Sequence, residues 1–441
     1  MRGRAGMKGL AADTEIETAP RLTPRPKPAD AGAMKHLYAR HRLDIRPADL
    51  LHALSAMPAG DQKRAAVEVE HVWSAGGPGL ACYSVRSGFH LLLKALALPR
   101  GSEVLFSAVT HPDMPRLALH HGLVPVPVDL EPATLAPRPM LVRRAITDRT
   151  RVLVVAHLFG GRVDLFELAE ICRTNGILLV EDCAQAFQVP DDTGGILADV
   201  SMFSFGILKT ATALGGAMLT VRKPDLLGRM RSIQQRWPVQ RRAAHLKRIV
   251  QTAVFVALTR PAPYAMLARL AAALEIDFDR LVNSSARAFP AGATDDLVHS
   301  IERQPNAPLL KFMEFRFKTF DRGRLLARAA AGEELASILP AGLHVGGLAP
   351  DHTHWLFPIV AERPDELIEL ARAAGFDAAR AASSVKAVSA PAGRPELEPA
   401  CALSVMSRLV FLPAYPELPQ GSLETLASAL EGHEVHAYAT R

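Results

Sequence analysis

Two apolar segments constrain the fold of this chain most. Each is followed by polar or charged side chains of the kinds that act in catalysis. Residues 177–180 read Ile-Leu-Leu-Val and lead directly into Glu181 and Asp182. About twenty residues later a second apolar segment, residues 200–205, contains Ser204 and is followed by Lys209. An apolar run that ends in an acid is typical of a buried parallel strand, because ligand crevices lie at the carboxyl ends of such strands.

An acid, a hydroxyl and a lysine at successive strand ends are what a pyridoxal phosphate (PLP) site needs. Asp182 would keep the pyridine nitrogen protonated, Ser204 would donate to the phosphate, and Lys209 would form the Schiff base and act as general acid and base. A buried lysine is costly unless its charge is removed or paired, and imine formation removes it. Taken singly, Asp182 could be a helix cap and Lys209 a surface lysine. Their joint placement with Ser204 favours a catalytic pair, Lys209 and Asp182.

Four short blocks resemble, in the same order, signatures of the DegT/DnrJ/EryC1/StrS aminotransferases. They are Arg86-Ser-Gly88, His157-Leu-Phe-Gly160, Glu181-Asp-Cys-Ala-Gln185 and Ser204-Phe-Gly-Ile-Leu-Lys209. The resemblance is good from about residue 84 to about residue 220. It implies a PLP-dependent transferase of fold type I, an α/β protein whose large domain holds a mostly parallel seven-stranded sheet beside a smaller α+β C-terminal domain. It also implies a homodimer, because fold-type I sites lie at a subunit interface.

The resemblance also suggests further cofactor-binding residues. Ser87 and Gly88 precede a predicted helix, whose first backbone N–H groups could cradle the phosphate. His111 occupies the position of a family aromatic residue that stacks on the ring, and Gln185 resembles the residue beside the phenolic oxygen. Each has a plainer alternative: Ser87-Gly88 could be an ordinary turn, and His111 a surface histidine at a helix start. His157 could likewise be a satisfied core histidine.

Three departures from the family pattern keep a second function open. Phe89 replaces the usual hydroxyl residue, the connection after Lys209 is two residues shorter, and the family's C-terminal motif is not recognisable at residues 383–388. The first hypothesis is an aminotransferase that moves an amino group, for instance from L-glutamate, to a keto group of a sugar nucleotide or related metabolite. The second is a non-catalytic or regulatory member that binds PLP or another ligand. Retention of Asp182, Ser204 and Lys209 favours the enzyme. Spacing does not choose the donor-carboxylate ligand among Arg408, Arg316 and residues of a partner chain.

The 441 residues are enough for two domains with substantial cores. We predict a disordered tail at 1–35, a PLP-binding α/β domain at 36–225, a basic and apolar helical insertion at 226–305 and a small α+β domain at 306–441. The net charge of +6 is modest and gives no reason to expect nucleic acid. The four cysteines have no C-x-x-C spacing, so we expect no metal site and no disulfide, as in a cytoplasmic protein.

The insertion combines a run of arginines with two apolar helical segments, within residues 229–274. One interpretation is peripheral contact with anionic lipid at the inner membrane face. The other, which we favour, is an oligomer or domain contact with solvated arginines. No apolar stretch reaches the roughly 18 residues of a membrane span, so any membrane contact would be peripheral.

Overall fold

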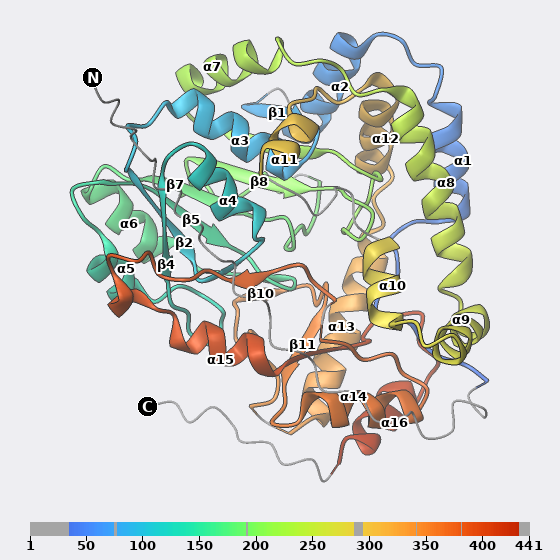
Figure 1. Cartoon of the computed structure of the whole chain (residues 1–441). Helices are drawn as coiled ribbons and strands as arrows, with labels where there is room; N and C mark the ends of the chain where they lie inside the picture. The colour runs from blue at the N-terminus through green and yellow to red at the C-terminus, as the bar shows by residue number, and fades with distance from the viewer. Residues whose placement is uncertain are drawn as a thin grey trace, which may run out of the picture.

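The computed structural model of the chain describes residues 35–74, 77–190, 193–285, 294–340, 342–380 and 382–431 (Figure 1). The predicted disordered tail therefore lies outside the described residues, except for Lys35. A central sheet carries helices on both faces, and a smaller C-terminal part lies below it in the view of Figure 1.

Within the described residues the central sheet has seven strands in the order β1-β9-β8-β7-β5-β2-β4. Their bounds are β1 Gly79–Cys82, β2 Glu103–Ser107, β4 Val124–Val128, β5 Thr150–Ala156, β7 Leu178–Asp182, β8 Val200–Ser204 and β9 Ala217–Val221. Strand β9 runs antiparallel to both of its neighbours, whereas every other pairing is parallel. The predicted mostly parallel seven-stranded sheet is confirmed.

The two faces of the sheet are apolar because alternate residues of each buried strand point to opposite sides. In β5, Val152 and Val154 enter one core and Leu153 and Val155 enter the other. The first core is covered by α3 (Val85–Leu96), α4 (Asp113–His120), α7 (Pro224–Gln234) and α11 (Thr294–Ile301). The second is covered by α5 (Pro139–Ala145) and α6 (Phe166–Thr174).

Trp73 centres a third core, beside β8 and β9, that α1 (Pro47–Ser55), α2 (Gln62–Ser74) and α12 (Ala307–Lys318) complete. Its ring centroid lies 4.9 Å from that of Phe203 and 5.4 Å from that of Phe317, and its indole nitrogen donates to the Thr220 hydroxyl at 3.3 Å. Helix α12 packs on α2. It thus lies with the large domain, although the predicted boundary at residue 306 assigned it to the small one.

The C-terminal part contains a two-stranded antiparallel sheet, β11 (Phe357–Val360) with β13 (Leu409–Leu412). Its helices are α13 (Arg322–Ile338), α14 (Pro364–Ala373), α15 (Ala400–Arg408) and α16 (Ser422–Ala429), with a short 3₁₀ turn at Pro395–Leu397. Two further strands reach the large domain: β10 (Asp351–His352) pairs with β6 (Gly161–Arg162), and β12 (Lys386–Ala387) pairs with β3 (Val109–Thr110). These pairings hold the small part against the loops that follow β2 and β5.

The predicted helical insertion contains α8 (Arg242–Leu258), α9 (Pro261–Ala273) and α10 (Phe278–Ser285), which lie along one flank of the molecule (Figure 1). Along α8, four apolar side chains at every fourth position are exposed: Leu246, Val250, Val254 and Leu258. Across the described residues, no helix is both long enough and apolar enough to span a membrane.

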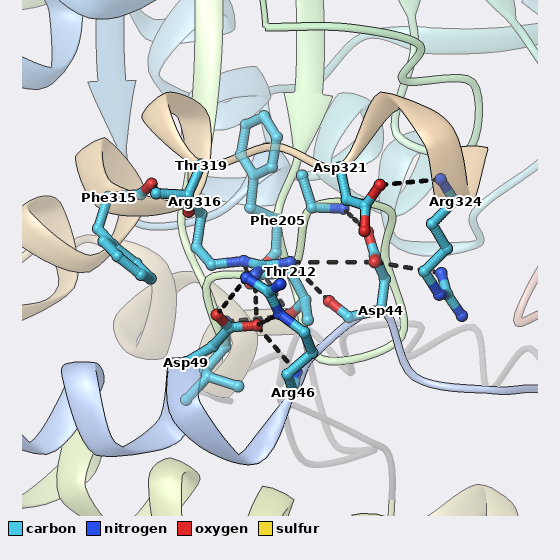
Figure 2. A network of polar contacts seen from close by, with 12 residues as sticks. Asp44, Arg46, Asp49, Phe205, Thr212, Phe315, Arg316, Thr319, Asp321 and Arg324 are labelled. Atoms are coloured by element: carbon cyan, nitrogen blue, oxygen red, sulfur yellow. Dashed lines mark hydrogen bonds and ion pairs between the residues drawn. The ribbon is translucent and has the colours of Figure 1, made fainter. Parts of the chain in front are cut away.

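The buried guanidinium of Arg316 joins three segments that are far apart in the sequence (Figure 2). It donates to the Asp49 carboxylate at 2.7 Å, to the Asp44 carbonyl at 2.7 Å and to the Thr212 carbonyl at 3.0 Å. Asp44 also accepts from the backbone N–H of Ala211 at 2.5 Å and from Arg324 at 3.1 Å. The network fixes the loop that follows Lys209.

We expect Arg316→Met to lower the free energy of unfolding by about 3 kcal/mol, because it leaves the buried Asp49 carboxylate without its main cationic partner. The matched control is Arg64→Met, which breaks the Arg64–Glu68 pair on the exposed side of α2. Urea denaturation should give a clearly lower midpoint for Arg316→Met and an unchanged one for Arg64→Met. Equal midpoints for the two variants would mean that Arg316 does not brace the fold.

Candidate active site

Lys209 and Asp182 act on each other at the carboxyl ends of β8 and β7. Burial lowers the pKa of Lys209 to about 7, against the opposing charge of Asp182 and with a further lowering by Arg86. Burial raises the pKa of Asp182, which the Ala184 amide and the Lys209 charge oppose. At neutral pH the Lys209 amine is therefore divided between its neutral, nucleophilic form and its charged form.

The Lys209 amine lies over the ring of Trp355, 4.1 Å from the ring centroid. The Trp355 indole N–H donates to the Leu208 carbonyl at 2.9 Å, and His41 Nε2 donates to the same oxygen at 2.9 Å. The peptide that carries Lys209 is thus held from the N-terminal segment and from the C-terminal part at once. The sequence did not indicate His41 or Trp355, because only the fold brings them to Lys209.

Asp182 and Ser204 end neighbouring strands, as predicted. The Asp182 carboxylate accepts from the Ala184 N–H at 3.0 Å. The half-buried Ser204 hydroxyl has no hydrogen-bond partner among the described residues, and its oxygen would lie 3.8 Å from a Cβ at Gly206. Ser204 is therefore free to donate to a ligand.

His157 is the satisfied core histidine of the plainer interpretation. Its Nδ1 accepts from the Val163 N–H at 2.9 Å, so that Nε2 donates to the Glu181 carboxylate at 3.0 Å. Glu181 also accepts from the Ser201 hydroxyl. Burial alone would raise the Glu181 pKa, but these hydrogen bonds, the His157 interaction and the Arg162 charge lower it to about 2. This pair fixes the start of the loop between β7 and β8 rather than facing a ligand.

The start of α3 lies earlier than the sequence suggested. Ser84 is the N-cap, and its side chain accepts from the Ser87 N–H at 3.1 Å. The Ser87 hydroxyl is fully buried and donates to the Ile301 carbonyl at 2.8 Å. A Cβ at Gly88 would lie 2.6 Å from Leu219, so this glycine serves close packing of α3 on β9.

Ser87 and Gly88 therefore differ from the prediction: they belong to the first turn of the helix and face the core, not a ligand. The N–H groups of a first turn that stay unpaired are those nearest the N-cap. Here the amide nearest the N-cap is that of Val85. The physical reason for the difference is the Ser84 side-chain cap, which places the helix start at Val85, four residues earlier than predicted.

Arg86 is a site residue that the sequence analysis quoted without giving it a role. Its Nε donates to the Asp113 carboxylate at 2.5 Å and its Nη2 to His111 Nε2 at 2.8 Å. Burial and the charge of Arg86 lower the His111 pKa to about 3, against the effect of Asp113, so the imidazole is neutral. The Lys209 charge contributes to the same shift, which places His111 in the electrostatic field of the site.

Gln185 links two loops at the site. Its side-chain oxygen accepts from the Phe159 N–H at 3.1 Å, and its amide nitrogen donates to the Ser383 hydroxyl at 3.2 Å. Phe159 has a left-handed backbone (φ 57°), a conformation that costs energy in a residue other than glycine. Ser383 lies in the segment where the family's C-terminal motif is absent, so Gln185 ties that segment to the cofactor side.

The two arginines considered for the donor carboxylate lie elsewhere. Arg316 is consumed by its network with Asp49, and Arg408 pairs with Glu362 at 2.7 Å. Arg328 on α13 is a buried arginine with an open donor: it is 5% exposed, its Nε donates to the Thr353 carbonyl at 2.9 Å, and its Nη2 has no partner among the described residues. Burial lowers the Arg328 pKa only to about 10, so it stays charged.

A small cleft is lined in part by Arg328. Its wall includes Trp355, whose ring contacts the Lys209 amine. The other wall residues include Arg40, His41, Arg42, Arg324 and Tyr415. Such a cationic cleft suits a substrate with a carboxylate or phosphate group.

The site fits PLP. It offers a buried carboxylate for the ring nitrogen, a lysine amine with a pKa near 7, and an unpartnered hydroxyl beside it. The buried Thr110 hydroxyl, one residue before His111, also lacks a partner among the described residues. Buried polar groups are normally paired, so these open groups are those that a polar ligand would satisfy.

The fold is that of known aminotransferases. The chain superposes on an aminotransferase, TlmJ, from Streptoalloteichus hindustanus with a TM-score of 0.62 and 19% identity, over 89% of this chain and 96% of that one. It superposes on NtdA from Bacillus subtilis, solved with bound cofactor PMP, with a TM-score of 0.63 and 16% identity, over 88% and 82% of the two chains. The chain therefore has fold type I of the PLP-dependent aminotransferases.

Residues 77–251 match the model of the DegT/DnrJ/EryC1/StrS aminotransferase family, the family that the motifs resemble. A curated relative is GDP-perosamine synthase of Caulobacter vibrioides, 30% identical over 157 residues. That match spans 35% of this chain and 42% of the relative, which is less than half of the relative's length. The predicted cofactor is the one that the family uses.

Proposed function

We propose that this protein is an aminotransferase that moves an amino group from an amino acid, L-glutamate or a close analogue, to a keto group on a sugar nucleotide or related polar metabolite. The observation that carries the proposal is the joint placement of Asp182, Ser204 and Lys209 at adjacent strand ends. The domain boundaries that accompany it are those of the sequence analysis, with α12 assigned to the large domain.

Each residue has a defined task in this reaction. PLP, when bound, supplies an electron sink for the negative charge that develops at the donor's α-carbon. Asp182 holds the ring nitrogen protonated, and a cationic nitrogen in turn compensates the cost of its buried carboxylate. The amide of Val85, at the start of α3, and the Ser204 hydroxyl donate to the phosphate. Lys209 Nζ anchors the cofactor and then, with a pKa near 7, takes the proton from the substrate carbon and returns it.

Arg328 is the residue that we propose for the donor carboxylate. Arg328 lines the same cleft as Trp355, whose ring contacts the Lys209 amine, and the Arg328 Nη2 has no hydrogen-bond partner among the described residues. Because the guanidinium is already held at Nε by the Thr353 carbonyl, little freedom is lost when an anion binds. The neighbouring Arg40, Arg42 and Arg324 give the same cleft the charge that a phosphate-bearing acceptor needs.

The first test is the visible spectrum of the purified protein supplied with PLP, before and after L-glutamate. We expect a lysine-linked absorption band that shifts when the amino donor is added. Lys209→Ala should lose that band. Lys223→Ala, a control at an exposed ion pair with Asp199, should keep both the band and its shift.

A band that no amino donor changes would contradict the aminotransferase and favour a regulatory PLP-binding protein. No band in any of the three proteins would exclude the cofactor itself. L-Glutamine, tested beside L-glutamate, decides which of the two the site accepts.

We expect Arg328→Gln to raise the half-saturating concentration of the amino donor about 10- to 100-fold, because a hydrogen bond to a charged group contributes about 1.5–3 kcal/mol. The rate at saturation should change little. The measurement is the concentration dependence of the donor half-reaction, followed by the shift of the visible band. Arg408→Gln is the control, since Arg408 pairs with Glu362.

Arg328→Lys is a control for a purely structural effect of the substitution. It keeps the positive charge but loses the planar guanidinium that donates from Nε and Nη2 at once. It should give an intermediate value if Arg328 binds the carboxylate. An unchanged half-saturating concentration in Arg328→Gln would assign the carboxylate to another residue.

We propose that the protein is a homodimer and that the exposed apolar row of α8 is part of the contact. Val250 and Val254 are 55% and 53% exposed, and Leu246 and Leu258 extend the row over more than three turns. Exposed apolar rows of this length commonly mark protein or membrane contacts. Peripheral membrane contact through residues 229–274 is the competing use of the same surface.

Light scattering on the purified protein should give about twice the chain mass. Val250→Glu with Val254→Glu should give a monomer, whereas Met140→Glu, at another exposed apolar side chain, should not. If the wild type is a monomer and instead binds anionic vesicles through Val250 and Val254, the surface is a membrane contact and the dimer proposal is wrong for α8.

A further inference from the structure

Three histidines come together where the C-terminal part meets the large domain. His344 follows α13, His352 lies in β10, and His354 is two residues further on. One ring nitrogen of each lies within 4.8 Å of a ring nitrogen of the other two. The ring centroids of His352 and His354 are 4.0 Å apart, and that of His344 lies 5.7 and 5.4 Å from them.

Two of these rings have buried nitrogens without a partner. Nε2 of His344 and Nδ1 of His354 make no hydrogen bond within the described part of the chain. His352 Nδ1 accepts from the His354 backbone N–H at 3.0 Å. Two unsatisfied buried nitrogens that face a third ring are an unfavourable arrangement unless a ligand completes them.

A second group of possible metal ligands differs from this one because its histidine nitrogens are already occupied. His157, Glu181 and Cys183 also lie within metal-binding distance of one another. There, however, the Val163 N–H and the Glu181 carboxylate already occupy both nitrogens of His157. That cluster is complete without an ion, whereas the cluster of His344, His352 and His354 is not.

The three rings are in the state that a metal requires. Burial lowers the pKa of His344 to about 4; burial and the charges around them lower those of His352 and His354 to about 2 and 3. The imidazoles are therefore neutral at pH 7, with lone pairs available. Two glycines make the space: a Cβ at Gly332 would lie 2.1 Å from His354, and one at Gly347 would lie 2.5 Å from His344.

We propose that His344, His352 and His354 bind a divalent transition-metal ion. A set of imidazoles without a carboxylate or thiolate suits Zn²⁺, Co²⁺, Ni²⁺ or Cu²⁺ rather than Mg²⁺ or Ca²⁺. The ligands of a tetrahedral zinc with bonds of about 2.0 Å lie about 3.4 Å from one another, so the three nitrogens, which lie within 4.8 Å of one another, need only a small approach.

The charge of Arg328 sets the fourth ligand. Arg328 is the charged side chain that acts on both His352 and His354. No acid among the three ligands offsets the two positive charges of the ion. The open fourth position should therefore hold an anion such as hydroxide rather than neutral water.

The ion would close the loop from His344 to His354 and so fix the segment that leads to Trp355. Thr353, between two ligands, donates to the Gly160 carbonyl at 2.9 Å and accepts from Arg328. The metal would therefore stabilise the contact between the two domains on one side of the lysine. Sequence analysis expected no metal because it considered cysteine spacing; the pattern H-x₇-H-x-H was the signal that it left unused.

The test is Co²⁺ binding by the untagged full chain, after treatment with a chelator and dialysis. Equilibrium dialysis should show one more bound Co²⁺ per chain in the wild type than in His344→Gln or His352→Gln, together with the visible bands of tetrahedral Co²⁺. His299→Gln, at an exposed histidine of α11, is the control and should match the wild type. Zn²⁺ should raise the denaturation temperature of the wild type and of His299→Gln only.

Equal Co²⁺ uptake by all four proteins would overturn the proposal and assign any binding to other histidines. The same holds if Co²⁺ binds but gives octahedral bands that no variant alters. His344 and His352 are half-buried, so circular dichroism of the two variants should show a folded protein. Because the measurement needs neither PLP nor substrate, its failure would leave the aminotransferase proposal untouched.

Discussion

The buried cation of Arg316 is the interaction on which the geometry of this molecule depends. Its guanidinium donates to the Asp44 carbonyl in the N-terminal segment, to the Asp49 carboxylate at the start of α1, and to the Thr212 carbonyl in the loop after Lys209. A single guanidinium with planar, divergent donors can bind all three, which an ammonium could not do with the same geometry.

In the candidate active site, burial rather than any single contact has the largest effect on the pKa values of the key residues. Burial lowers the pKa of Lys209, so that part of the amine is neutral and nucleophilic at neutral pH. Burial also raises the pKa of Asp182, so a cationic partner is needed to keep its carboxylate ionised. His111 is kept neutral by Arg86, so it can contact a ring without adding charge. The pKa shifts of Lys209, Asp182 and His111 depend on one another, because the Lys209 charge acts on both other groups. The cationic cleft beside Trp355 is lined by residues from other elements.

Much of this could be predicted from the sequence where the signal is local. The apolar runs before Asp182 and Lys209 predicted two strands of the sheet correctly, since strand patterning is a property of a few neighbouring residues. That Lys209 and Asp182 form a catalytic pair stays a prediction. The position of Ser87 was mispredicted because the helix start is set by the side chain of Ser84. His41, Trp355 and Arg328 could not have been found in this way: each reaches the site through contacts between distant segments, and nothing near them in the sequence marks it.

The cleft lies largely outside the part of the chain that resembles its family. Residues 77–251 contain Asp182, Ser204 and Lys209, while Arg40, Arg328 and Trp355 lie before or after them. In the proposed reaction, the residues for the cofactor and those for the substrates are thus encoded in separable stretches of the gene. Substitutions in the flanking stretches would then alter which molecules are accepted without touching Asp182, Ser204 or Lys209, so similarity within the central stretch is a poor guide to the natural acceptor.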